Sequence, residues 1–355
     1  MTDIAIIGAG MAGASLAAAM SGEAKVLVLE AESQPGYHAT GRSAAFWSES
    51  YGGPLIQPLT SASRAFLDDH GLLRPRGAIH LADAEGRPTL DALRAAFPDV
   101  PLHLLDRTAL EAAIPGLKPG RDHGLAEPTC ADIDVAGLHG LYLGQARKNG
   151  ATLITDAPLL HAAREGGRWR IATAAGSFEA DILVDAAGAW ADEVAARCGE
   201  RPLGIIPYRR TIAQLRVDPP APADLPLVID AGELFYFKSE AGGRLWLSPH
   251  DETLCPPGDC APEEIDVALA IDRFERIVDW RIEAVERKWA GLRSFAPDRL
   301  PVYGFGGGGN GFFWFAGQGG FGIQTAPAAA ALGAALLLGR IPALDPAPYS
   351  ALRFA

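Results

Sequence analysis

Apolar runs separated by small residues predict the first elements of the chain. Residues 4–7 form a continuous apolar run, which is typical of a strand buried on both faces. A small-residue helix is expected over residues 14–20, and a second apolar strand over residues 25–29. The order of strand, helix and strand predicts a βαβ unit at the start of the chain.

Helical and strand-like patterns then alternate as far as residue 205. An amphipathic pattern followed by Lys-Asn-Gly predicts a long helix over residues 134–149. Further helices are expected at residues 59–70, 90–97 and 108–114. Strands are expected at residues 77–82 and 151–156, in a hairpin of 169–173 with 177–180, and at 181–185 before another helix.

The pattern changes between residues 206 and 292. Short strand-like runs, separated by a Pro-rich linker at 218–226, predict one antiparallel sheet in a second lobe. These runs lie at 211–217, 234–238 and 244–248, with helices expected at 262–274 and 276–280. The tail returns to the opening style, with a strand at 311–316, a glycine turn and a helix at 323–338.

These elements predict an α/β fold, α+β overall, with a Rossmann-like lobe and a substrate lobe built on an antiparallel β-sheet. Because the tail repeats the style of the opening unit, we expect the C-terminal part to fold back beside it. The predicted cofactor-binding domain is therefore discontinuous and comprises residues 1–75, 130–205 and 294–355. The predicted substrate domain comprises residues 76–129 and 206–293.

Composition and charge narrow the function classes. The chain has 355 residues, 48% of them hydrophobic, and a formal net charge of −12. That charge argues against nucleic-acid binding, which needs clustered Lys and Arg. No apolar run is long enough to span a bilayer and no basic leader precedes residue 3, so a cytoplasmic protein is expected. The four cysteines lack metal-site spacing and are expected to be thiols, although Cys255 and Cys260 could form a bridge if oxidised.

Gly8, Gly10 and Gly13 follow the first strand with G-x-G-x-x-G spacing. The first glycine permits a tight turn, the second lets the backbone approach a pyrophosphate, and the third lets the helix pack on the strand. Glu30 ends the second strand, where an acid accepts hydrogen bonds from a ribose hydroxyl. The spacing and the acid predict a dinucleotide site, with an ordinary βαβ glycine turn as the alternative.

A polar, glycine-rich loop follows Glu30 and turns into a short helix near Ser43. Its Thr40, Arg42 and Ser43 would suit a second phosphate contact, whereas the alternative is a plain connecting loop.

Together these segments resemble the D-amino-acid oxidase/glycine oxidase superfamily of FAD enzymes and, within it, bacterial D-arginine dehydrogenase and its relatives. The resemblance runs nearly end to end. It is carried by the motifs at 36–45 (GYHATGRSAA), 131–134 (ADID), 186–190 (AAGAW), 207–210 (PYRR), 289–295 (WAGLRSF) and 318–325 (QGGFGIQT).

The resemblance implies noncovalent FAD as the cofactor. No cysteine lies near the C-terminal glycine turn, where some relatives make a covalent flavin bond. The implied FAD-binding residues are Gly8, Gly10, Gly13, Glu30, Arg42, Ser43, Ala187, Gly188, Gly319 and Gly320, the last two toward the flavin ring.

The same resemblance implies that Arg210 and Arg293 hold the carboxylate of a small substrate. A planar guanidinium grips a carboxylate through two parallel hydrogen bonds, which places the α-carbon for hydride transfer to flavin N5. Tyr51 and Tyr236 would line the pocket, and Gln318 would lie by the flavin edge. Arg209 and Arg210 are adjacent in a strand-like run, so only one of them can face the pocket.

Two departures from the family pattern bear on the substrate. Phe46 stands at the position of a pocket histidine, followed by Trp47 and Ser48, and Ala78 stands where relatives carry the acid that pairs with a cationic substrate. The loss of that acid favours a non-basic, hydrophobic side chain. His80 lies on the same strand face as Ala78 and is an alternative source of the missing imidazole.

The sequence therefore predicts an FAD-dependent D-amino-acid dehydrogenase or oxidase that yields an imino acid and requires no metal. Two alternatives stay open: oxidation of a secondary amine, imino acid or 2-hydroxy acid, and a flavoprotein subunit without turnover. The sequence specifies neither the electron acceptor nor the oligomeric state.

Overall fold

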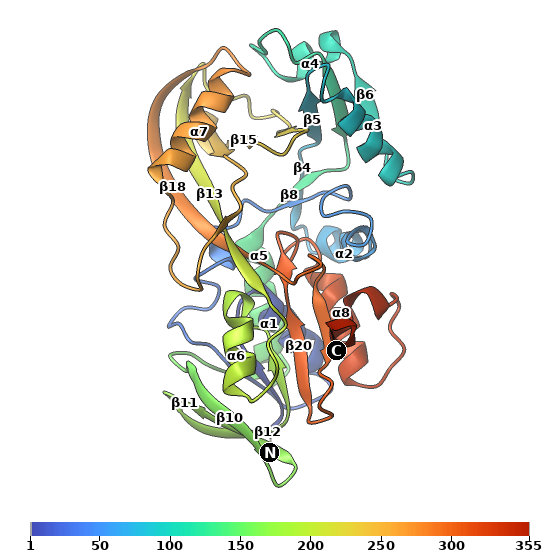
Figure 1. Ribbon diagram of the computed structural model, residues 1–355, viewed down its shortest axis with the longest axis vertical. Coiled ribbons are helices and arrows are strands. Elements are labelled where there is room, and N and C mark those ends of the chain that lie inside the picture. Colours follow the sequence, from blue (N-terminus) through green and yellow to red (C-terminus); the bar gives the residue numbers. More distant parts are fainter. Residues whose placement is uncertain (1, 355) are drawn as a thin grey trace.

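The computed structural model describes residues 2–354 and shows an elongated molecule with two lobes (Figure 1). Both ends of the chain lie in the lower lobe, beside helices α1 (Met11–Met20), α5 (Val135–Lys148), α6 (Ala191–Arg197) and α8 (Ala326–Leu337). The upper lobe carries α3 (Arg87–Ala96), α4 (Arg107–Ala113) and α7 (Glu264–Glu275). Helix α2 (Gln57–Asp69) lies near the junction of the lobes.

The lower lobe is built on an eight-stranded sheet with the strand order β10-β11-β12-β1-β2-β9, extended by β20 and β19. The pairs β12–β1, β1–β2, β2–β9 and β12–β20 are parallel. The strands are β1 (Thr2–Ile7), β2 (Val26–Leu29), β9 (Thr152–Ile154), β10 (Leu159–Glu165), β11 (Arg168–Thr173), β12 (Gly176–Asp185), β19 (Val302–Phe305) and β20 (Phe312–Ala316).

Both faces of this sheet are buried, which explains the continuous apolar runs of β1 and β2. Ile4 and Ile6 pack in a core with residues of α1 and α8. Ala5 and Ile7 point the other way and pack with residues of α6, β10 and β11. Alternating side chains along one strand thus enter two separate cores.

The upper lobe is built on a ten-stranded sheet with the order β21-β18-β13-β16-β15-β14-β5-β7-β6, in which β17 also pairs with β13. All of its pairs are antiparallel except β14–β5. Its strands are β5 (Ala78–Ala82), β6 (His103–Leu105), β7 (His123–Glu127), β13 (Ile206–Asp218), β14 (Leu227–Asp230), β15 (Tyr236–Glu240), β16 (Arg244–Ser248), β17 (Thr253–Leu254), β18 (Arg281–Phe295) and β21 (Gln318–Gly319).

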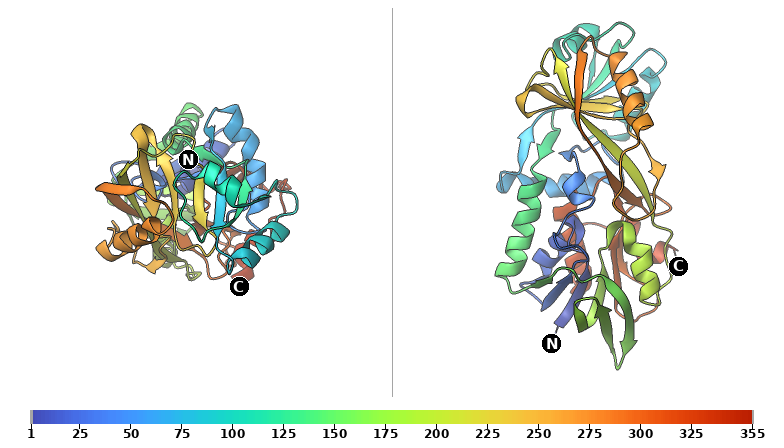
Figure 2. Two further views of the ribbon diagram at one scale, coloured as in Figure 1. Left: turned by 90° about the horizontal axis from the view of Figure 1, so that it is seen from above. Right: turned by 90° about the vertical axis from the view of Figure 1, so that its left-hand side faces the viewer.

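The two longest strands connect the lobes. Strands β13 and β18 pair along their length and extend from the upper lobe toward the lower one, as both side views show (Figures 1 and 2). A small third sheet, with the order β3-β8-β4, combines β3 (Phe46–Trp47), β4 (Leu73–Pro75) and β8 (Ala131–Ile133). The division into two domains stays a prediction, although the strands of the two large sheets fall within the predicted segments, apart from β21 and the last two residues of β18.

The predicted fold class is confirmed, but several local predictions need correction. Residues 276–280 are not a separate helix: the first three amides of this segment donate to Arg273 O and Phe274 O at the end of α7, and the chain then pairs with a distant turn, where Asp279 N–H donates to Gly116 O. Strand β12 runs through what was predicted as two separate strands, and β10 and β18 were not predicted as strands. Among the described residues, no helix is both long and apolar enough to cross a membrane.

Candidate active site

One cavity of about 1100 Å³ is lined by residues of both lobes. It begins at the glycine loop between β1 and α1 and continues past β13, β15 and β18 to the helix α3. A volume of about 1100 Å³ is large enough for a cofactor-sized ligand.

The glycine loop packs backbone against backbone. Gly8 has a φ of +98°, and a Cβ at this position would lie 2.7 Å from Ala186 O. A Cβ on Gly13 would overlap Gly8 O, so this glycine allows α1 to sit directly against the turn. The N–H of Met11 at the start of α1 donates to Thr40 Oγ1 at 2.9 Å. Gly8 and Gly10 line the cavity, whereas Gly13 supports the turn from behind.

Glu30 presents a preorganised carboxylate to the cavity. Its Oε2 accepts from Ala9 N at 2.6 Å and its Oε1 accepts from Glu32 N at 3.0 Å. These two amides fix the carboxylate where β2 ends, beside the glycine loop. This is the arrangement expected of an acid that binds a ribose hydroxyl.

Arg42 and Ser43 also line the cavity, but the Arg42 guanidinium is engaged by protein groups. It donates to Cys260 O and Ala290 O and pairs with Asp259 at 2.5 Å. Cys260 and its neighbour Cys255 are free thiols with sulfur atoms 3.0 Å apart. The guanidinium therefore ties the loop after β2 to β18 and to the loop before α7.

The remaining predicted cofactor residues meet the same cavity from other elements. Ala187 and Gly188 follow β12, and Gly319 and Gly320 belong to the C-terminal glycine turn. Gln318 lines the cavity and donates from Nε2 to Phe315 O at 2.9 Å. The fold thus brings together segments that are separated by up to about 300 residues in the sequence.

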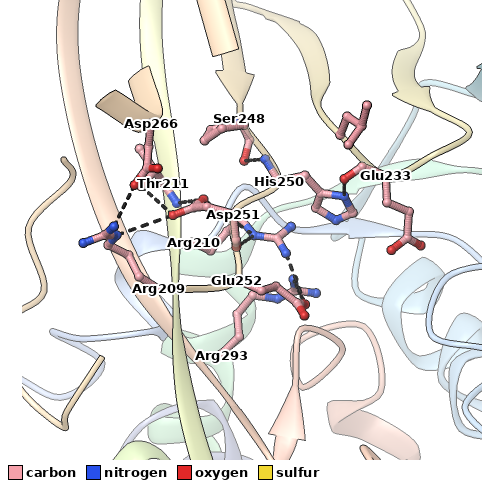
Figure 3. Close-up of polar contacts among 12 residues, drawn as sticks. Arg209, Arg210, Thr211, Glu233, Ser248, His250, Asp251, Glu252, Asp266 and Arg293 are labelled. Atoms are coloured by element: carbon pink, nitrogen blue, oxygen red, sulfur yellow. Dashed lines mark hydrogen bonds and ion pairs between the residues drawn. The ribbon is translucent and has the colours of Figure 1, made fainter. Parts of the chain in front are cut away.

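Arg210 and Arg293 both line the cavity, and Figure 3 shows their side chains meeting at Glu252. Arg293 Nη2 donates to the Tyr51 hydroxyl, and a Cβ on Gly320 would overlap the Arg293 guanidinium. The glycine turn therefore leaves room for this arginine. Burial, followed by the charge of Arg293, lowers the pKa of Arg210. Two guanidinium groups in one cavity attract an anion.

A loop between β16 and β17, residues 249–252, supplies carboxylates that sequence reasoning missed. Glu252 Oε1 lies 3.4 Å from both Arg210 Nη2 and Arg293 Nη1, and Glu252 also pairs with Arg299 at 2.9 Å. Arg210 Nε donates to the main-chain oxygen of Asp251 at 2.8 Å. Glu252 thus lies on the two arginines that were predicted to hold a substrate carboxylate. No local signal in the sequence connects this loop with β18.

Arg209 points to the opposite face of β13, as the alternation of a strand requires. It pairs with Asp266 at 2.7 Å and with Glu263, both at the start of α7, and it does not line the cavity. The two arginines share Asp251, which lies 3.5 Å from Arg209 Nε and 4.0 Å from Arg210 Nε. Their other partners differ: Arg209 joins β13 to α7, and Arg210 faces the cavity.

An aromatic wall stands beside the arginines. The ring of Phe46 lies 5.2 Å from that of Tyr51 and 6.4 Å from that of Tyr236. All three line the cavity, whereas Ala78 is buried beneath them in a cluster with Phe46 and Tyr236. His80, two residues further along β5, lines the cavity, and burial lowers its pKa to about 4.

A second missed carboxylate lies behind this wall. Glu127 is fully buried, and it accepts from Ser48 Oγ at 2.8 Å, Ser50 Oγ at 2.5 Å and Glu49 N at 2.7 Å. Burial raises its pKa despite these donors. Glu127 lies directly across from Ala78 in the β5–β7 pair, so a carboxyl group is present on the strand next to Ala78 although Ala78 itself has none. Within residues 2–354, no group of His, Cys, Asp and Glu is arranged to hold a metal ion.

The chain matches the model of a known family, FAD dependent oxidoreductase (DAO), over residues 3–336. The chain belongs to the FAD-dependent oxidoreductase family. The cofactor expected from the sequence, FAD, is thereby confirmed, and the backbone cradle at Gly8 and the fixed carboxylate of Glu30 fit a dinucleotide.

Two curated relatives and one solved structure define the similarity. Hydrogen cyanide synthase subunit HcnC of Pseudomonas aeruginosa is 26% identical over 230 residues, which are 63% of this chain and 54% of the relative. Glycine oxidase of the same organism is 30% identical over 254 residues, 67% of this chain and 65% of the relative. The matches thus span half to two thirds of these relatives. The structure of glycine oxidase from Geobacillus kaustophilus has a TM-score of 0.84 at 23% identity and covers 98% of each chain, which shows a shared fold.

Proposed function

We propose that this protein oxidises a D-amino acid with a non-basic, hydrophobic side chain to the corresponding imino acid. The observation that carries the proposal is the pair of cavity-facing arginines, Arg210 and Arg293, beside the aromatic wall of Phe46, Tyr51 and Tyr236. The similarity to a glycine oxidase supports an amino-acid substrate.

The protein residues position the substrate. Arg210 and Arg293 hold its carboxylate through charge-assisted hydrogen bonds, and the Tyr51 hydroxyl orients Arg293. The aromatic rings take up the substrate side chain and exclude water from the α-carbon. Gly8, Gly10 and Glu30 would hold the cofactor, and Gln318, Gly319 and Gly320 would lie by its ring. Bound FAD supplies the redox chemistry by accepting the hydride.

The selection against a cationic side chain follows from the surrounding charges. Ala78 offers no carboxylate, and the carboxylate of Glu252 already pairs with Arg210, Arg293 and Arg299. A substrate guanidinium or ammonium would be repelled by these arginines, which costs free energy in a buried site. Glu233 also lines the cavity, but its side chain is exposed, so its carboxylate is screened by solvent and compensates little of that cost. A hydrophobic side chain has no such cost.

Two alternatives give different results in the same assay. A secondary amine, imino acid or 2-hydroxy acid carries the same carboxylate and fits the same pair of arginines. A flavoprotein subunit without turnover, as the similarity to a synthase subunit would permit, binds FAD but oxidises none of these compounds.

The test is anaerobic mixing of the FAD-loaded protein with a panel of compounds, followed through the absorbance of the oxidised flavin. We expect hydrophobic D-amino acids to bleach the flavin at least about 10-fold faster than D-arginine or the matching L-amino acids. Bleaching by N-methyl amino acids or 2-hydroxy acids alone would show that the substrate is a secondary amine or a 2-hydroxy acid and not a D-amino acid. The absence of any turnover by the purified chain with an artificial electron acceptor would support the subunit. Release of the yellow colour by acid precipitation would agree with noncovalent FAD.

A further inference from the structure

His250 belongs to the same loop as Glu252 and is held in a defined orientation. Its backbone has a φ of +55°, in the left-handed region, and its N–H donates to Ser248 Oγ at 3.2 Å. The ring Nδ1 lies 2.7 Å from Glu233 O. The ring edge faces Tyr236, with the two centroids 5.7 Å apart. A backbone conformation that few residues adopt is therefore maintained next to the cavity.

These contacts determine which ring nitrogen carries the proton. A main-chain carbonyl can only accept, so Nδ1 of His250 carries the hydrogen and donates it to Glu233 O. Nε2 is then left with its lone pair. Burial, with the charges of Arg210 and Arg293, lowers the pKa of this histidine to about 3, so the ring stays neutral at ordinary pH.

The neutral ring lies beside the proposed carboxylate site. His250 lines the same cavity as Arg210 and Tyr236, and Figure 3 shows its ring next to the Arg210 guanidinium with Nδ1 turned to Glu233. The amine and the carboxylate of an α-amino acid are attached to one carbon atom. A group that binds the amine must therefore stand close to the arginines.

His80 is the other imidazole of the cavity and a weaker candidate. Its buried Nε2 has no hydrogen-bond partner among the described residues, so no contact determines its tautomer. It lies on β5, whereas the loop of His250 contacts Arg210 directly through Asp251 and Glu252.

We propose, on the basis of the proposed function, that His250 Nε2 accepts a hydrogen bond from the substrate's α-amine and orients it. The neighbouring arginines disfavour a proton on this ring, so His250 positions the amine and does not remove its proton. The amine reaches the site in its neutral form after losing a proton to solvent. The residue touches substrate, and its contact fixes the rotation of the substrate about the bond between carboxylate and α-carbon.

Two small probes separate this contact from the carboxylate contact. 2-Aminoisobutyrate carries an amine and a carboxylate but no α-hydrogen, so it binds without being oxidised. Pivalate has the same shape, with a methyl group in place of the amine. Calorimetry on the FAD-loaded protein, at a pH above the pKa of the free probe's amine so that no deprotonation cost opposes binding, should give tighter binding of 2-aminoisobutyrate than of pivalate.

The test variant is His250→Asn, because asparagine tolerates positive φ and its amide can still donate to Glu233 O. We expect its affinity for 2-aminoisobutyrate to fall about 10-fold and its affinity for pivalate to stay unchanged. The matched control, His80→Asn, should bind both probes as the wild type does. With an amino acid that bleaches the flavin, His250→Asn should lower the rate of reduction 10- to 100-fold.

Several outcomes would overturn the proposal. Wild-type protein that binds the two probes equally or binds neither contradicts it. So does a His250→Asn variant that keeps the wild-type preference, or one that loses affinity for both probes equally at an unchanged Tm. The proposed function fails separately, when no amino acid bleaches the flavin of the wild-type protein. The calorimetric comparison is decided independently of that result.

Discussion

The cofactor end and the substrate end of the cavity are built on different principles. At the cofactor end the contacts are mainly between backbone groups: Gly8 meets Ala186 O, Gly13 meets Gly8 O, and two amides hold the Glu30 carboxylate. At the substrate end, charged side chains from separate strands and a loop meet. There the two positive charges of Arg210 and Arg293 repel each other and are both paired with the carboxylate of Glu252. The first region is therefore sensitive to added atoms, and the second to a change in charge.

The largest effect is expected from a single methyl group at the cofactor end. A Cβ on Gly13 overlaps Gly8 O, and neither main chain can move without displacing β1 or α1. Gly13→Ala should displace the Gly8 turn and lower the affinity for FAD about 100-fold, which corresponds to about 3 kcal/mol of binding free energy. The measurement is a fluorescence titration of the apoprotein with FAD. Gly22→Ala is the matched control, because a Cβ there meets nothing within 4 Å. Equal FAD affinity in the two variants would contradict the backbone-packing account.

The next effect distinguishes the two adjacent arginines of β13. Arg210→Lys keeps the charge but loses the planar guanidinium, so kcat/KM for an amino acid that the protein oxidises should fall about 100-fold. Arg209→Lys should lower Tm, because Arg209 joins β13 to α7, and change kcat/KM by less than about twofold. Steady-state kinetics and thermal unfolding of both variants measure this difference. A similar loss of kcat/KM in both would show that strand alternation does not separate their functions.

A smaller effect of opposite sign is expected at Glu252. Its carboxylate occupies the positions on Arg210 and Arg293 that a substrate carboxylate would take. Glu252→Gln removes this competition, so the affinity for pivalate should rise about 3- to 10-fold. Calorimetry gives the dissociation constants. Weaker binding of pivalate would show instead that Glu252 holds the arginines in their binding positions.

The smallest effect concerns pH and the buried acid behind the serines. The pKa of Glu127 is raised above its ordinary value of 4.5 in the folded protein, because burial disfavours its charged form. The stability that the protonated acid contributes is therefore fully present below pH 4.5 and is lost as the pH rises through the raised pKa. In Glu127→Gln this loss should be absent, so the variant should gain Tm relative to wild type as the pH rises through that range. Parallel Tm profiles of the two proteins would refute a raised pKa.

The two ends of the cavity also differ in how well their residues could be predicted. At the cofactor end, Gly8, Gly10 and Glu30 stand close together in the sequence, and their spacing alone predicts a turn that approaches a dinucleotide. The family and FAD, expected from longer motifs, are confirmed. The individual roles of the site residues stay predictions. At the substrate end, Arg210 was chosen over Arg209 by resemblance, and the structure places Arg210 in the cavity.

Glu252, His250 and Glu127 carried no signal in the sequence. Each acts through partners 40 or more residues away or, for His250, through a carbonyl oxygen that any residue possesses. The absence of an acid at Ala78 was visible, but not that the neighbouring strand carries Glu127. The prediction of a helix at 276–280 is wrong because the segment ends α7 and then pairs with a turn about 160 residues earlier, where Asp279 N–H donates to Gly116 O and Trp280 Nε1 donates to Pro115 O.

The sequence by itself determined the βαβ opening, the glycine cradle and the opposite directions of Arg209 and Arg210. These follow from local spacing, from strand period and from the conformations that glycine allows. Only the tertiary structure decided which charges and which imidazole stand beside the arginines. Their positions depend on the register of β13 with β18 and on the path of one loop between β16 and β17. Long-range packing sets both, and no local pattern of residues records it.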